Sequence, residues 1–150
     1  MYKESKLKQN NERYAKACLI FAKRLGLVDD DSLDGVKSRC EKENEKRNAQ
    51  KENGDVFYGL THYTFREYLE WELTKIKLDF VSESETVKES YNFREISKKE
   101  LKAFYKNNKD LFTRFNGDKF PFRDVKLIIK KKIREEEFEN EINNILCKLD

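Results

Sequence analysis

The side chains suited to metal or nucleophilic chemistry are few and scattered in this sequence of 150 residues. There is one histidine, His62, and the three cysteines, Cys18, Cys40 and Cys147, include no Cys-x-x-Cys pair. Structural zinc needs four clustered Cys or His ligands, and a catalytic histidine needs a placed nucleophile or carboxylate. The sequence therefore predicts no metal, no cofactor and no catalytic residue. The cysteines are interpreted as small apolar or half-exposed free thiols, which favour a reducing compartment.

Short enzyme signatures are also missing from the sequence. No Gly-x-Ser-x-Gly, His-Glu-x-x-His, P-loop or dinucleotide-binding glycine pattern occurs. The three aspartates at 29–31 lack the alternating ligands and terminal glutamate of a calcium loop, so we interpret them, with Ser32, as candidate helix caps. Carboxylates are abundant, but abundance on charged helices is not a paired acid and base.

The strongest basic feature is a run near the C-terminus, formed by Lys126, Lys130, Lys131, Lys132 and Arg134. This run is the best candidate in the sequence for a polyanion contact. Three glutamates at 135–137 follow at once, and the chain balances 32 basic against 29 acidic residues. A solvated helix face is therefore the favoured interpretation, and we predict no nucleic-acid partner.

The elements that must position these groups are predicted to be helices. The chain is 41% charged and has five glycines and one proline, a composition typical of a helix-rich domain with few tight turns. No stretch of about 18 apolar residues is present, and the first 14 residues lack the apolar core of a signal peptide. Apolar spacing predicts an all-α fold of about five helices, near residues 6–25, 33–51, 65–80, 98–105 and 122–149.

Local signals mark several of the expected helix ends. Gly26 is a natural stop for the first helix, and Thr64 with Glu67 and Ser97 with Glu100 are capping boxes. The polar stretch 82–95 is interpreted as either a flexible link or a frayed helix end. Trp71 lies off the apolar stripe of its helix, and either a second packing face or an exposed position is open for it.

Two connectors are far more apolar than loops usually are. The first contributes Phe57, Tyr58, Leu60 and Tyr63, and the second contributes Phe112, Phe115, Phe120 and Phe122. Loop backbones normally face water, so these side chains need either neighbouring helices or a partner to cover them. Core filling between helices is the alternative to a binding role for each residue.

Four groups of positions in the N-terminal half form a recognisable pattern. They are Ala22, Gly26 and Leu27, then Glu41, Glu43, Asn44 and Arg47, then residues 53–59 and 63–68. This pattern resembles the N-terminal chaperone domain of SurA/PrsA-type peptidyl-prolyl isomerase proteins of Gram-positive bacteria. Segments 96–112 and 122–146 are similar to the two ends of that domain, between which such proteins carry a parvulin domain.

The resemblance implies a chaperone-type domain without its isomerase. A parvulin domain needs roughly 90 residues, and only about ten lie between Asp110 and Phe120. We therefore expect no isomerase activity and no enzyme. The chain is expected to be a single domain, 1–150, in which 1–13 forms an N-terminal junction and 110–121 is the connector where relatives carry the parvulin domain.

The leading functional hypothesis from the sequence is a non-catalytic, chaperone-like domain that binds unfolded or extended protein clients through the aromatic connectors. The alternatives are an assembly module with one defined partner, including a homodimer, and an enzyme of unfamiliar type. The resemblance implies an exported or membrane-anchored location with a trimmed N-terminal anchor. The absence of a visible signal and the three thiols favour the cytoplasm instead.

Overall fold

The computed structural model describes residues 2–54, 56 and 62–149, and it is all-helical. No β-strand occurs in these residues; Thr113 and Lys119 form an isolated antiparallel bridge. The all-α prediction is therefore confirmed. The helices are α1 (Tyr2–Arg24), α2 (Leu33–Glu52), α3 (Phe65–Val81), α4 (Glu85–Ser90), α5 (Lys98–Asn107) and α6 (Phe122–Lys148), with a 3₁₀ turn η1 (Lys109–Phe112).

Capping side chains fix where the helices begin and end. Thr64 and Glu67 form the predicted capping box at α3, with both reciprocal hydrogen bonds present. Ser97 caps α5 by accepting from Glu100 N–H, but the Glu100 carboxylate turns away to form two bonds with Arg94. At the end of α1, Gly26 has a φ of +77°, a left-handed conformation that glycine adopts without steric cost.

The sequence pattern missed α4. The stretch 82–95, expected as a link or a frayed end, contains this short helix and then an extended segment. Ser84 caps α4 by accepting from Val87 N–H, and Val87 itself is fully buried. One buried side chain is too weak a periodic signal to reveal a six-residue helix from sequence.

The core divides into two clusters, which define two lobes. The first lobe combines α1, α2, α3 and α4 with the second half of α6, and its largest buried side chains include Phe80, Phe138 and Leu19. The second lobe, residues 96–134, packs α5, η1 and the following loop on the first half of α6. Its buried core is formed by Leu101, Phe112, Val125, Ile129 and Ile133.

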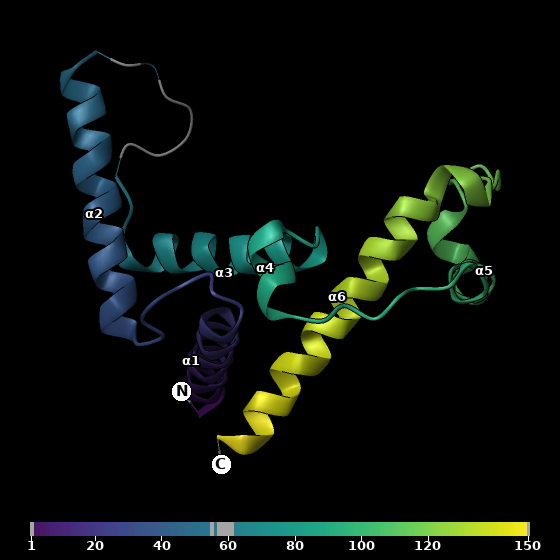
Figure 1. Cartoon of the computed structure of the whole chain (residues 1–150), viewed down its shortest axis with the longest axis horizontal. Helices are drawn as coiled ribbons and strands as arrows, with labels where there is room; N and C mark the ends of the chain where they lie inside the picture. The colour runs from purple at the N-terminus through teal and green to yellow at the C-terminus, as the bar shows by residue number, and fades with distance from the viewer. Residues whose placement is uncertain (1, 55, 57–61, 150) are drawn as a thin grey trace.

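Helix α6, predicted near 122–149, runs through both lobes. It packs on α1 and α3 near the C-terminus and on α5 near its own start. Figure 1 shows α2 rising at one side and α5 with the start of α6 rising at the other, with α3 between them. The molecule is open rather than compact. Its accessible surface is 11156 Å², whereas a compact monomer of this mass has about 8,100 Å².

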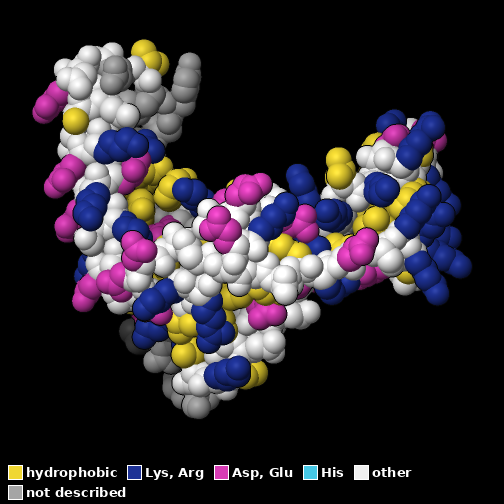
Figure 2. Space-filling model, in the orientation of Figure 1, with side chains coloured by type: hydrophobic (Ala, Val, Ile, Leu, Met, Phe, Trp, Pro, Cys, Tyr) yellow, Lys and Arg dark blue, Asp and Glu magenta, His cyan; other side chains and the backbone are white. Residues whose placement is uncertain are grey.

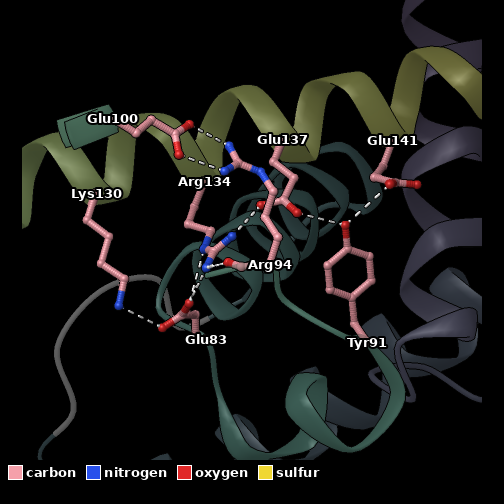
Figure 3. A network of polar contacts seen from close by, with 8 residues as sticks. All are labelled: Glu83, Tyr91, Arg94, Glu100, Lys130, Arg134, Glu137 and Glu141. Carbon is pink, nitrogen blue, oxygen red and sulfur yellow. Dashed lines mark hydrogen bonds and ion pairs between the residues drawn. The ribbon is translucent and has the colours of Figure 1, made fainter. Parts of the chain in front are cut away.

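A polar network ties the extended segment after α4 to the middle of α6 (Figure 3). Arg134 is 2% exposed, donates to the Arg94 carbonyl at 2.6 Å, and pairs with Glu83 at 2.8 Å and Glu137 at 2.7 Å. Its guanidinium also lies 4.7 Å from the centre of the Phe93 ring. The network therefore joins the two lobes through a buried charge rather than through apolar packing alone.

Burial opposes ionisation of Glu83, but the hydrogen bonds and charges of Lys130 and Arg134 outweigh it and lower the pKa of this carboxyl. Glu83 also has a φ of +53°, which is unusual for a residue with a side chain.

Among the described residues, no helix is long and apolar enough to cross a membrane.

Candidate functional site

Only some aromatic residues of the first predicted binding surface belong to the part of the chain that the structure describes. Phe57, Tyr58 and Leu60 lie outside the described residues. Tyr63 is half-buried and joins α2 to the start of α3, because its backbone N–H donates to Asn44 Oδ1 at 2.7 Å and its carbonyl accepts from Asn44 Nδ2 at 2.9 Å. Helix α2 thus packs on the rest of the first lobe through one buried face, which includes Val36, Cys40 and Asn44.

The second aromatic connector is largely a small core. Phe112 is buried, and Phe120 and Phe122 are half-buried beside the Tyr105 side chain, whose hydroxyl donates to the Phe120 carbonyl at 2.6 Å. These three residues fill space between helices, the alternative that the sequence had left open. Phe115 alone of this set is fully exposed. Within segment 110–121, Phe112 and Phe120 therefore anchor the loop to the second lobe, while most of its other residues are exposed.

The cysteines and the histidine do not form a reactive centre. Cys18 and Cys40 are buried and Cys147 is exposed, and all three are free thiols. Burial raises the pKa of the Cys18 thiol to about 12 and also raises that of Cys40. His62 is exposed. No group of three or more His, Cys, Asp or Glu side chains able to hold a metal ion is found in the described part of the chain.

The pocket with buried polar groups lies between α2, α3 and the turn after α1. It has a volume of about 450 Å³ and is bordered by Gly26, Leu27 and Val28 on one side. A larger cavity of about 950 Å³, between α1 and α3, is lined mainly by apolar side chains, and the polar pair on its border, Arg66 and Glu70, is exposed. Polar groups that converge within a concave surface are what orient a ligand, so we take the α2–α3 pocket as the candidate site.

An incomplete ion pair lies in this pocket. Arg39 Nε donates to Glu72 Oε1 at 2.8 Å, and the Glu72 side chain is only 7% exposed. The other two atoms of the fork, Arg39 Nη2 and Glu72 Oε2, are buried without a hydrogen-bond partner, and they are the two such side-chain atoms in the described residues. A side-on arginine–carboxylate fork normally uses both pairs of atoms. One donor and one acceptor of this pair are therefore buried without a hydrogen bond.

Aromatic rings form a second wall of the pocket. The rings of Tyr68 and Trp71 have centres 5.5 Å apart, and Tyr63 lies 5.8 Å from Tyr68 and 6.3 Å from Trp71. Trp71 is 42% exposed, so it takes both of the roles that the sequence had left open, packing on one side and facing solvent on the other. The Lys75 ammonium lies 5.4 Å from the centre of the Trp71 ring, and Lys75 is itself exposed.

The charged groups around these rings are suited to holding polar ligands. Glu43, Glu72 and Asp79 line the pocket together with Arg39. Two of the three carboxylates are already paired with arginines. Glu72 pairs with Arg39, and Glu43 accepts a hydrogen bond from Arg47 at 3.1 Å. Burial, followed by the charge of Glu72, raises the pKa of Tyr68 to about 12, so its hydroxyl stays protonated at neutral pH.

Sequence reasoning overlooked this pocket because its members come from separate helices. Arg39 lies in the highly charged helix α2, and Glu72 stands next to Trp71 in α3, a helix recognised by its apolar stripe. Neither residue carries a local motif. The one available signal was Trp71, a large aromatic residue off the core stripe of its helix.

No family model and no curated protein matches the chain. Two solved structures do match, the native and selenomethionine forms of the GH136 lacto-N-biosidase from Eubacterium ramulus. Each has a TM-score of 0.76, is 25% identical, and covers 91% of this chain. The chain covers 28% and 27% of those proteins, so it spans little more than a quarter of their length.

This similarity overturns several sequence-based hypotheses. The SurA/PrsA resemblance is wrong, and with it the expected chaperone function and the expectation of no enzyme, because the matching structures are glycoside hydrolases. The resemblance rested on a helix end at 22–27, charged helix positions at 41–47, the loop 53–59 and the helix start at 63–68. Such features specify where a helix begins and ends, and unrelated helical folds share them.

Proposed function

We propose that the chain is the helical domain of a glycoside hydrolase related to the GH136 lacto-N-biosidase, and that its α2–α3 pocket contacts the saccharide. The observation that carries the proposal is the similarity to that enzyme over 91% of the chain, at 25% identity. A match of this extent includes both lobes and the long helix that joins them. It therefore relates the whole architecture and not a single pair of helices.

The open shape supports a domain that packs against a second protein domain. The accessible surface exceeds that of a compact monomer by about 3,000 Å², and the matching enzyme is more than three times as long as this chain. An interface of standard size buries about 800 Å² on each partner. The surplus surface is ample for contact with a second domain that supplies the remaining groups of an active site.

The chemistry of the α2–α3 pocket supports a saccharide as the ligand. A hydroxyl group both donates and accepts, so one sugar hydroxyl, inserted between the two side chains, would accept from Arg39 Nη2 and donate to Glu72 Oε2, two buried atoms that this insertion uncovers. The C–H face of a sugar ring carries slight positive charge and is attracted to the electron-rich face of an aromatic ring such as Trp71. Lys75, which lies over that ring, is exposed and free to move aside.

The test is hydrolysis by the protein in its native form. The tagged chain is expressed in its own host, isolated under native conditions with everything attached to it, and assayed on an aryl lacto-N-bioside. The proposal predicts hydrolysis. It also predicts that Trp71→Ala, which removes the aromatic wall of the pocket, lowers kcat/KM about tenfold or more. A tenfold loss corresponds to about 1.4 kcal/mol of transition-state stabilisation. The quantity and composition of the isolated material should stay the same.

Leu78→Ala is the matched control, because Leu78 is also exposed and lies seven residues along the same helix. Its activity should equal that of the unchanged protein. Isolated material that is folded but releases no aryl group from this substrate would contradict the hydrolase assignment. Hydrolysis that is equally strong in Trp71→Ala would keep the hydrolase and remove the pocket from it.

A further inference from the structure

The charge of the molecule is divided unequally between its lobes. The second lobe, residues 96–134, has thirteen basic and four acidic residues, a net charge of +9, whereas the whole chain has +3. The rest of the chain therefore carries −6. Lys130 and Arg134 are paired with Glu83 of the first lobe, but the other eleven basic residues still exceed the four acidic ones. Figure 2 shows Lys and Arg side chains crowded at this end of the molecule.

Exposed apolar side chains gather on the same lobe. Eight large apolar residues are exposed among those whose exposure the structure describes, and four of them belong to the second lobe. A lobe of 39 residues thus holds half of these side chains. They are Leu111, Phe115, Leu127 and Ile128.

Phe115 is the most exposed of the four, and it lies on a tight loop. Arg114 N–H donates to the Asp118 carbonyl, and Gly117 N–H donates to the Arg114 carbonyl at 2.9 Å. Gly117 has a φ of +92°, which suits glycine and closes the turn. The Phe115 side chain is 110% exposed, more than in an extended reference chain, and Arg114 and Lys119 beside it are exposed too.

We propose that the second lobe binds the surface of an anionic lipid membrane, with Phe115 entering the interface. Basic residues are attracted to anionic headgroups, and exposed apolar side chains gain by leaving water for the acyl boundary. This combination is the one that the lobe presents. The proposal stands apart from the hydrolase assignment, because it uses neither the α2–α3 pocket nor a catalytic group.

The composition of the lobe favours lipid over other polyanions. Ten of its thirteen basic residues are lysines, and lysine is depleted in protein–protein interfaces but reaches easily from an apolar boundary to the headgroups. Single-stranded nucleic acid is bound by stacking on aromatic rings. Three of the four exposed apolar residues here are aliphatic, and aliphatic side chains provide no such stacking.

The test is co-sedimentation of the full chain with vesicles of phosphatidylcholine alone or with about 30 mol% phosphatidylglycerol. We expect binding to the anionic vesicles and not to the neutral ones. Phe115→Ser should weaken binding several-fold, and Lys126→Gln with Lys131→Gln should weaken it by about fivefold for each lysine. Lys42→Gln with Lys46→Gln is the matched control, because both side chains are exposed on α2 in the first lobe.

Three results would overturn the proposal. They are the absence of binding to anionic vesicles, binding that Phe115→Ser leaves unchanged, and stronger binding to single-stranded DNA than to vesicles at the same salt concentration. Phe115 is fully exposed, so its replacement should leave the circular dichroism spectrum and the thermal midpoint unchanged. A folded variant therefore keeps the outcome interpretable.

Discussion

The two lobes are stabilised in different ways, although one helix runs through both. The first lobe has fifteen buried residues in its cluster, with Phe21, Phe80 and Phe138 in mutual contact at ring distances of 5.6–5.7 Å. The second has five buried residues, a packed loop and a polar network at its base. A small core contributes less to stability, so the second lobe depends more on its attachment to the first.

The unequal cores predict which part of the molecule opens first. The first lobe should unfold only with the whole chain, whereas the second should open locally at lower free energy. The arrangement also separates the two proposed roles. The α2–α3 pocket lies in the larger lobe, and the basic, apolar surface lies in the smaller one.

The largest effect is expected from Phe80→Ala. Phe80 is fully buried and its ring contacts those of Phe21, Tyr91, Phe93 and Phe138, so truncation should cost about 3–5 kcal/mol of global stability. Phe112→Ala, the matched change in the second lobe, should mainly increase hydrogen exchange in α5 and η1. Urea unfolding combined with hydrogen exchange distinguishes them, and a global loss of similar size for both would show that the lobes are one cooperative unit.

Arg134→Met tests the attachment between the lobes. It removes the buried donor of Glu83 and Glu137, which keep Lys130 and Tyr91 as partners, so the loss should lie at the lower end of the about 3–5 kcal/mol typical for one partner of a buried ion pair. The double variant Arg134→Met with Glu83→Gln should recover part of this loss in urea unfolding. Arg66→Met, from an exposed pair, should change stability by less than about 0.5 kcal/mol. An equal cost for Arg66 and Arg134 would refute a special role for the network.

The pH dependence of stability should contain a contribution from Glu83. The pKa of this carboxyl is lower in the folded protein than its ordinary value of 4.5, so the folded state resists its protonation. Its stabilising contribution is therefore complete above pH 4.5 and is lost as pH falls through the lowered pKa. Unfolding free energies measured from pH 7 downward should fall more steeply in the unchanged protein than in Glu83→Gln. Parallel curves would argue against the ion pairs.

The smallest effect concerns the thiols. Cys18 and Cys40 are buried with raised pKa values, whereas Cys147 is exposed at the end of α6. Under native conditions a thiol reagent should modify one cysteine per chain quickly, and all three after unfolding. Cys147→Ser should remove the fast reaction. Rapid modification of a second thiol would show that the first lobe opens more readily than its core implies.

Much of the fold was predictable because it follows from local signals. Thr64, Ser97 and Gly26 mark helix ends through short-range hydrogen bonds or a special backbone conformation, and the apolar stripe of α6 needs no partner to be recognised. Helix α4 and the division into two lobes were not predictable. Both depend on which distant side chains bury Val87 and Arg134, and sequence spacing does not contain that information.

The candidate site was much harder to predict than the fold. Arg39 and Glu72 are 33 positions apart, and each resembles an ordinary residue on a charged helix. Their significance comes from the packing of α2 on α3, which buries the pair and leaves half of its fork open. In the second aromatic connector, Phe112 is buried and Phe120 packs beside it in the core of the second lobe, whereas Phe115 is exposed.

The most direct measurement is a titration of the chain with lacto-N-biose, followed by tryptophan fluorescence. Trp71 is the single tryptophan in the sequence and lies in the α2–α3 pocket, so its emission reports on that site alone. We predict a saturable change with a Kd on the order of 1 mM or below, which is lost in Glu72→Gln and unchanged in Leu78→Ala. An emission spectrum that stays constant up to saturating saccharide, in a folded chain, would contradict it.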